Sequence, residues 1–240
     1  MKFFFPNSND IIDPTFNFVE ETRSRWRIPF RDDLHPHQVF SEPPYDGILV
    51  SKSIVDGTGS SGGKFSLAQK HRIYRSGVRK YFGIENLPIM TMGDCGAFSY
   101  VNEIDPPVTV AEVIEFYGAC QFDYGLSVDH VILGYNRDLD NTLPGMSLVP
   151  DDWKYRRAKT LELAQDFRDK HRQSSYTFTP VGVAQGWSPK SYADSAGSLQ
   201  EIGYENIAIG GLVPLKSKDI LDVVHEVHKV IQKEIDIHLL

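Results

Sequence analysis

The sequence of 240 residues lacks any hydrophobic run long enough to cross a membrane, and it contains only two cysteines. A membrane-spanning helix needs about 20 consecutive apolar residues. Near the N-terminus, the apolar run 3–5 ends at Pro6, so the core of a signal peptide is also missing. Cys95 and Cys120 belong to no CxxC motif or Cys/His cluster, which argues against a disulfide framework and a zinc site. These absences predict a protein of a reducing, cytoplasmic compartment with no membrane partner.

Charge of one sign is not in large excess either, since 25 Lys and Arg residues stand against 32 Asp and Glu, a net charge of −7. Hydrophobic residues make up 41% of the chain, and this balance is typical of a soluble globular domain. It excludes a disordered tail, a collagen-like fibre and a coiled coil. The acidic total argues weakly against a large nucleic-acid footprint, but only local basic patches decide that question.

Both common nucleotide-binding fingerprints are missing, because no GxGxxG follows the first apolar run and no Walker A loop occurs. From residue 47 on, short apolar runs alternate with longer segments of helical periodicity, a pattern that predicts a parallel sheet covered by helices. The apolar runs are 48–50, 89–92, 125–128, 181–184, 207–209 and 237–240. The helical segments are about 66–82, 108–119, 151–172, 190–202 and 217–234, with Ser66 and Thr109 as N-caps.

Residues 1–46 differ from the rest of the chain in their six prolines, which have aromatic residues between them. Proline fixes φ and removes a hydrogen-bond donor, so long helices and central strands are not expected here. The aromatic side chains favour burial over disorder; they are Phe3, Phe4, Phe5, Phe16, Phe18, Trp26 and Phe30. We therefore expect an irregular N-terminal arm, residues 1–46, packed on a barrel domain of residues 47–240.

A polar or glycine-rich cluster follows almost every apolar run. The clusters are Ser51-Lys52-Ser53, Gly93-Asp94-Cys95-Gly96, Asp129-His130, Gln185-Gly186-Trp187 and Gly210-Gly211. Functional groups at the carboxyl ends of successive strands are typical of a TIM-type (β/α) barrel. Six strands can be identified where eight are needed, so we expect an α/β barrel that is incomplete at its last strands. Since an open edge is unstable alone, a second polypeptide or a homo-oligomer should complete it.

Two aspartates in these clusters are candidate functional groups. Asp94 lies between glycines just after a strand and would project into the barrel mouth, although it could equally cap the next turn. Asp129 also follows a strand, and crowding with Asp94 around a shared ligand would separate their pKa values. The alternative for Asp129 is an ion pair with a basic neighbour.

The remaining candidates have equally ordinary alternatives. The carboxamide of Gln185 suits the edge of a nucleobase or a structural role, and the amides at Gly210–Gly211 suit an anion or a tight turn. Arg72, Arg75 and Arg79 recur at helical spacing and predict either a contact with a phosphate backbone or a solvated face. His35 and His37 have no third ligand at a suitable spacing, so no metal site is expected.

These motifs, in this order and approximate spacing, resemble tRNA-guanine transglycosylases. Gly93-Asp94-Cys95-Gly96-Ala97-Phe98 resembles their Asp-Ser-Gly-Gly-Phe segment, and Ser127-Val128-Asp129 resembles their Phe-Asp segment. Val183-Ala184-Gln185-Gly186 resembles Gln-Gln-Gly, and Ile209-Gly210-Gly211-Leu212 resembles Val-Gly-Gly-Leu. The closer resemblance, which covers nearly the whole chain, is to the DpdA branch that acts on DNA. It includes residues 1–10, 45–52 and 184–189.

The resemblance implies a pentosyltransferase that exchanges guanine in DNA for a 7-deazaguanine base through a covalent sugar–enzyme intermediate. Asp94 would be the general acid/base for the leaving and entering bases. Asp129 would accept hydrogen bonds from the Watson–Crick edge of the base, while Gln185 and the amides of Gly211 and Leu212 would bind its carbonyl or 7-substituent. Cys95, which replaces a serine of the family, is grouped with these substrate-binding residues. A guanine inside a duplex must first leave the stack.

Two features of the family have no counterpart in this chain. The nucleophilic aspartate would lie on the strand after the one that ends at Leu240, and the Cys/His zinc site would follow it, so no cofactor is expected here. Asp236 precedes the last strand and would face the opposite end of the barrel. The chain could be a domain of a longer protein or one half of a split enzyme, or another aspartate could substitute. The alternatives from other classes are a non-catalytic base-binding subunit that pairs with an active partner and a barrel hydrolase acting on sugars.

Overall fold

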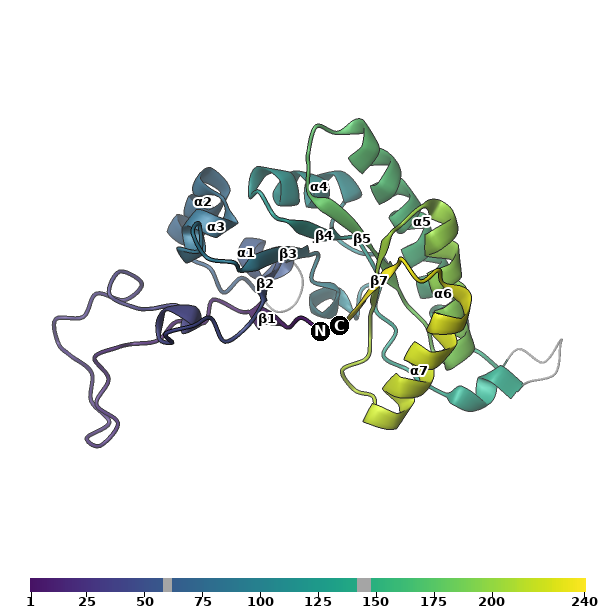
Figure 1. The fold of residues 1–240 in the computed structure, drawn as a ribbon, viewed down its shortest axis with the longest axis horizontal. Helices are drawn as coiled ribbons and strands as arrows, with labels where there is room; N and C mark the ends of the chain where they lie inside the picture. The colour runs from purple at the N-terminus through teal and green to yellow at the C-terminus, as the bar shows by residue number, and fades with distance from the viewer. Residues whose placement is uncertain (58–61, 142–147) are drawn as a thin grey trace.

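The computed structural model describes residues 1–57, 62–141 and 148–240, which form a single curled sheet with helices on its outside (Figure 1). The sheet has seven strands, all parallel, in the order β1-β2-β3-β4-β5-β6-β7. The strands are β1 (Phe4–Asn7), β2 (Gly47–Ser51), β3 (Met90–Asp94), β4 (Tyr124–Leu126), β5 (Thr179–Ala184), β6 (Asn206–Ile209) and β7 (Asp236–Leu239). This is an incomplete barrel of the TIM type, as the alternation of strands and helices predicted.

Six of the strands, β2 to β7, lie on the six predicted apolar runs, whereas β1 lies in the segment expected to be irregular. β1 pairs with β2 in the register Phe4↔Gly47 to Asn7↔Val50 and has no second partner among the described residues. Pro6 is compatible with this position because an edge strand leaves one row of N–H groups unpaired. The prediction of six strands was therefore one too low.

The helices cover the convex face of the sheet. They are α1 (Lys52–Asp56), α2 (Leu67–Ser76), α3 (Val78–Phe82), α4 (Val110–Ala119), α5 (Asp151–Gln173), α6 (Pro189–Ile202) and α7 (Ser217–Val230), with short 3-10 helices η1 (Pro36–Gln38), η2 (Ala97–Tyr100) and η3 (Arg137–Asn141). The predicted N-caps are confirmed, since Ser66 Oγ accepts from the amide of Gln69 and Thr109 Oγ1 from that of Glu112, each at 3.3 Å. The single helix predicted over 66–82 is wrong: Gly77, at φ 81°, divides it.

Most of the core lies between the helices and the sheet. The concave face of the sheet carries a smaller buried cluster of Met92, Leu126, Val181, Val183 and Ala208. At the two edges, the ring of Phe4 on β1 meets the ring of His238 on β7 edge-on, with centroids 5.4 Å apart. The two edges of the sheet thus curl toward each other, and the chain ends lie side by side in Figure 1, yet β1 and β7 share no hydrogen-bond ladder among the described residues.

Between β1 and β2 the chain makes a long excursion, which contains most of the N-terminal arm and projects from the half-barrel (Figure 1). A bridge between Ile12 and Leu34 closes its base. The expected burial of the aromatic residues is wrong for Phe3, Phe18, Trp26 and Phe30, which are exposed, Phe18 and Trp26 to 83% and 89%. Polar contacts within the arm, rather than an apolar core, hold its shape. The division of the chain at residue 46 remains a prediction.

Among the residues that the structure describes, no helix is both long enough and apolar enough to span a membrane.

Candidate active site

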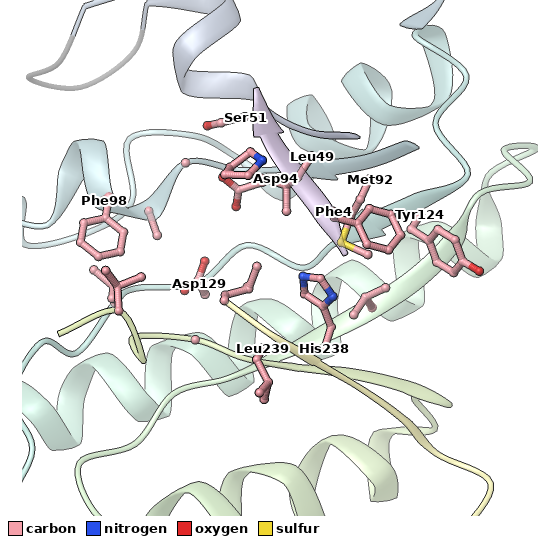
Figure 2. A pocket seen from close by; sticks show the side chains of 18 of the residues that line it. Phe4, Leu49, Ser51, Met92, Asp94, Phe98, Tyr124, Asp129, His238 and Leu239 are labelled. Carbon is pink, nitrogen blue, oxygen red and sulfur yellow. The ribbon is translucent and has the colours of Figure 1, made fainter. Parts of the chain in front are cut away.

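The polar clusters that follow successive strands meet at one end of the sheet, because the carboxyl ends of parallel strands share an edge. There they line a cavity of about 1110 Å³ along the concave face (Figure 2). Its polar lining at the mouth comes from β2, β3 and the segments after β4, β5 and β6. These residues are Ser51, Asp94, Asp129, Gln185, Gly210 and Gly211. The sequence therefore identified a group of residues that the fold brings together.

Asp129 is buried, and both of its carboxylate oxygens accept hydrogen bonds. Gln185 Nε2 donates to Oδ2 at 2.7 Å, and the Cys95 thiol donates to Oδ1 at 3.2 Å. Burial, reinforced by the nearby charge of Asp94, raises the pKa of Asp129 to about 7. The carboxyl group can therefore exchange a proton near neutral pH.

Asp94 is the last residue of β3 and is partly exposed toward the cavity (Figure 2). The amide of Gly96 and the hydroxyl of Ser51 donate hydrogen bonds to its carboxylate, yet burial still raises its pKa. Ser51 lies directly opposite Asp94 in the β2–β3 register. Gly96 is required here, because its φ is 91° and a Cβ atom would lie 1.8 Å from Ser53 Oγ.

Basic side chains of the described residues do not pair with either of the two carboxylates. Within residues 1–57, 62–141 and 148–240, neither Asp94 nor Asp129 forms an ion pair with a basic side chain. The ordinary alternative for Asp129, an ion pair with a neighbour, does not occur in this part of the chain. A pair of uncompensated carboxyl groups in a cavity, with raised pKa values, is typical of acid/base sites and of sites that bind hydrogen-bond donors.

Gln185 is fixed from both ends of its carboxamide. Its Nε2 donates to Asp129, and its Oε1 accepts from the amide of Ile132 at 3.1 Å. The glycines after β6 make room for it, since a Cβ at Gly210 would lie 2.4 Å from Gln185 Nε2. Gly211 has a φ of 74°, and a Cβ there would lie 2.8 Å from the Ile132 carbonyl. Both glycines thus allow the backbone to lie close to neighbouring groups, and both line the cavity.

Two residues predicted to bind substrate lie outside the cavity lining. Cys95 is fully buried behind Asp129 and does not line the cavity. Leu212 is also buried away from it, and its amide donates to the carbonyl of Leu240 at 3.3 Å. Both side chains still belong to the same end of the sheet. Neither is presented directly to a ligand in this conformation.

The three arginines predicted to share one helix face are separated by the break at Gly77. Arg72 and Arg75 are exposed on α2, whereas Arg79 belongs to α3. The guanidinium of Arg79 donates to the carbonyls of Ile89 and Leu87 and pairs with Asp123 at 3.2 Å. Those groups lie at the amino ends of β3 and β4, away from the cavity mouth. Arg79 therefore stabilises loops at the opposite end of the barrel through these contacts.

Three residues of the site were not predicted as functional. Phe98, in η2, is 53% exposed and lines the cavity (Figure 2), whereas Tyr100 of the same 3-10 helix is buried. Ser51 holds Asp94. The polar cluster after β2 and the phenylalanine of the Asp94 segment were visible as signals in the sequence. Nothing in the sequence shows which way each side chain of the turn points.

In the described parts of the chain, no group of three or more His, Cys, Asp or Glu side chains is arranged to hold a metal ion. The two histidines of the arm have structural partners instead. His37 bonds the hydroxyl of Tyr45 at 2.8 Å and the carbonyl of Phe82 at 3.0 Å, and its ring stacks on that of His35.

Fold and site together define an α/β barrel-type protein whose strand ends surround a cavity with two carboxyl groups and a carboxamide. No protein-family model matches the chain. The chain is 47% identical, over 243 residues, to a protein named DNA-guanine transglycosylase from Salmonella montevideo. The match covers 100% of this chain and 56% of that relative, so the chain spans little more than half of its length. This chain is thus a homologue of DNA-guanine transglycosylase, which confirms the resemblance found in the sequence.

Proposed function

We propose that this chain forms the base-binding half-barrel of a glycosyltransferase that exchanges guanine in DNA for a 7-deazaguanine base. The observation that carries the proposal is the placement of Asp94, Asp129 and Gln185 around one cavity at the strand ends. The homologous protein, whose name specifies guanine and DNA, supports the same substrates. A target base would enter the cavity after leaving the DNA stack.

The chemistry of the cavity suits a guanine-like ring. Ionised Asp129 accepts hydrogen bonds, and guanine presents two neighbouring donors, the ring N1–H and the 2-amino group. Gln185 Nε2 donates one of its two N–H groups to Asp129, and the second N–H would serve the carbonyl of the base. Phe98 offers an exposed aromatic face at the cavity for stacking. Gly211 adds a backbone amide without a side chain that would exclude the ring.

In the exchange reaction, a carboxylate would attack C1′ of the target nucleotide and break the bond between C1′ and N9. Asp94, whose pKa is raised by burial, would give a proton to the departing guanine when its carboxyl group is in the acid form. The incoming 7-deazaguanine would lose its N9 proton to Asp94, and N9 would then attack C1′ and release the carboxylate. We assign the attacking carboxylate to no residue of this chain. Asp236 opens β7, at the end of the barrel remote from Asp94.

The zinc site of the resembling family has no counterpart in the described residues, because no suitable group of ligands is present there.

The open edges of β1 and β7 define the partner that the half-barrel needs. Their facing rings are in contact, and the apolar concave face borders the cavity. One further parallel strand, inserted between β1 and β7, would satisfy the unpaired backbone groups of both edges and close the lumen. We propose that a further polypeptide segment supplies it, from the rest of a longer protein, a second polypeptide or another copy of the chain.

A non-catalytic role is the second candidate, and the absence of an assigned nucleophile favours it. Such a subunit would use Asp129, Gln185 and Phe98 to hold a base while another chain performs the chemistry. Mutation of Asp94 to Asn in the complete, active assembly distinguishes the two. Exchange that survives this change would exclude Asp94 as the acid/base.

Mass spectrometry of nucleosides tests the proposal. The protein is incubated with guanine-containing duplex DNA and a 7-deazaguanine base, and the digested DNA is examined for the modified deoxynucleoside. We expect the product only when the segment that closes the barrel is present. Product from the 240-residue chain alone would show that the nucleophile lies within it. No product from the complete assembly, together with no binding of guanine to the chain, would overturn the proposal.

A further inference from the structure

Behind Asp129 lies a chain of hydrogen bonds that does not reach the cavity. The hydroxyl of Tyr100 lies 3.0 Å from Cys95 Sγ, and the Cys95 thiol donates to Asp129 Oδ1 at 3.2 Å. The same tyrosine hydroxyl lies 3.1 Å from the backbone carbonyl of Asp129. Tyr100 thus contacts both the main chain of Asp129 and the thiol that bonds its carboxylate.

The turn after β3 separates residues that face the cavity from residues that face the core. Asp94, Gly96 and Phe98 line the cavity, whereas Cys95 and Tyr100 are 0% and 1% exposed and do not. Cys95 and Tyr100 therefore cannot touch a base directly. They can act on one only through the carboxylates that they contact, which are Asp129 for both residues and also Asp94 for Cys95.

We propose that Tyr100 and Cys95 are positioning residues that fix the carboxylate plane of Asp129 so that it faces a base in the cavity. A carboxylate held by one donor can rotate about its last side-chain torsion. Here both oxygens accept hydrogen bonds, Oδ2 from Gln185 and Oδ1 from Cys95, and these two bonds together block the rotation. The inference rests on the proposed function only for the identity of the ligand, since the hydrogen bonds exist without it.

The strength of the hydrogen bond from the Cys95 thiol also influences the pKa of Asp129. A thiol is a weaker hydrogen-bond donor than a hydroxyl, so it stabilises the ionised carboxylate less. The hydroxyl of Tyr100 polarises the thiol, and hydrogen bonds in such a chain strengthen one another. The titratable groups that face Asp129 are Asp94 at the end of β3, Cys95 after it, Tyr100 of η2 and Tyr117 of α4.

The test follows the titration of Asp129 by NMR of aspartate carboxyl carbons, with the resonance assigned by its loss in Asp129→Asn. Cys95→Ala removes the donor and should move the midpoint upward by about half a pH unit to one pH unit. Cys95→Ser restores a stronger donor and should move it below that of the wild type. Tyr100→Phe should move it in the same direction as Cys95→Ala, but less.

Tyr117→Phe is the matched control. It removes a buried phenol hydroxyl from the same core, and that hydroxyl has no hydrogen-bond partner among the described residues. We expect the midpoint of Asp129 to be unchanged in this variant. Thermal unfolding of each variant separates general destabilisation from a change at Asp129.

Equal midpoints in the wild type, Cys95→Ala and Tyr100→Phe would overturn the inference, whatever happens to the melting temperature. Guanine binding to the same variants, measured by calorimetry across pH, tests the proposed function separately. If the midpoints move as expected and no variant or wild type binds guanine, the positioning of Asp129 stands and the proposed ligand is wrong.

Discussion

Aspartates play opposite parts at the cavity and in the N-terminal arm. At the cavity, Asp94 and Asp129 have no basic partner in the described residues, and burial raises the pKa of both. In the arm, Arg27 pairs with Asp33 at 2.7 Å and with Asp13 at 3.2 Å, and a hydrogen bond from Thr15 lowers the pKa of Asp13. In the arm, ion pairs between side chains stabilise the conformation of the segment. The two carboxylates at the cavity form no such pairs within the described residues.

Aromatic residues show the same division. The rings between the helices and the sheet pack against one another in the core, as Tyr117 does with Phe122 and Phe178. In the arm, Phe18 and Trp26 are exposed, and polar contacts at Asp13 and Asp33 replace the core. The composition of a segment therefore does not show whether its apolar residues are buried. What matters is whether a second layer of structure lies over them.

The largest expected effect is on the rate of base exchange, which should depend on an aspartate of the cavity but not on one of the arm. Asp94→Asn should lower base exchange by the assembled enzyme at least about 100-fold, because the proton donor and acceptor is lost. Binding of guanine should change little. The same substitution in the arm, Asp13→Asn, is the control and should leave exchange near the wild-type rate. Quantification of the modified deoxynucleoside measures both, and exchange that persists in Asp94→Asn would contradict the assignment.

Binding of the base should depend on Asp129 and on pH. Asp129→Asn should weaken guanine binding by roughly 10- to 100-fold, the range expected for loss of hydrogen bonds to a charged group. Since only the ionised carboxylate accepts both donors of the base, affinity in the wild type should fall as pH drops below about 7. Isothermal calorimetry between pH 5 and 8 measures this. An affinity that stays constant across that range would show that Asp129 does not bind the base as an anion.

Stability should respond to pH with opposite signs in the two regions. The pKa of Asp129 rises from its ordinary value of 3.8 to about 7, so the folded protein keeps a proton that the unfolded chain releases. The contribution of Asp129 to the free energy of unfolding therefore falls as pH rises from about 4 to 7. Asp129→Asn removes the buried charge and should therefore raise the melting temperature at pH 8 by several degrees. A change of about 1 kcal/mol in the free energy of unfolding corresponds to roughly 2–4 °C in a chain of this size. The gain should disappear near pH 4.

Asp13 provides the contrast for that measurement. Its pKa is lowered, so its contribution is present above the ordinary value and is lost as pH falls. Asp13→Asn should therefore lower the melting temperature at pH 8, if only slightly, since single ion pairs close to the surface contribute little to stability. Shifts of the same sign in both variants would mean that the two regions do not differ as described.

The smallest effect concerns the arginines of α2 and α3. Arg72→Glu with Arg75→Glu should weaken binding of DNA a few-fold and reduce its salt dependence if these exposed residues contact phosphates. Arg79→Glu should lower the melting temperature instead, because its guanidinium bonds the carbonyls of Ile89 and Leu87. Salt titrations of DNA binding measure the difference. Equal salt slopes in the double variant and the wild type would leave α2 as a solvated face.

Much of the fold could be predicted because its cause is local. Apolar runs of strand length lie at β2 to β7, and the hydroxyls of Ser66 and Thr109 begin their helices as expected. The meeting of Asp94, Asp129 and Gln185 also followed from the sequence. Parallel strands bring their carboxyl ends to one edge, so residues placed after successive strands become neighbours without any knowledge of side-chain contacts.

Other features depend on contacts between distant residues, and no local pattern predicts them. β1 exists because residues 4–7 find the edge of β2, where Pro6 is tolerated. Arg79 leaves the face of Arg72 and Arg75 because the backbone turns at Gly77. Phe18 and Trp26 stay exposed because no described element covers them.

The sequence by itself therefore determined the barrel-type alternation, the strand ends and the residue types gathered there. Tertiary structure alone decided which of those residues face the cavity. The turn after β3 directs Asp94 and Phe98 to the cavity and Cys95 and Tyr100 to the core, where they contact Asp129 from the segment after β4. The physical reason is that the direction of a side chain in an irregular turn is set by the packing around it, and that packing comes from residues far away in the sequence.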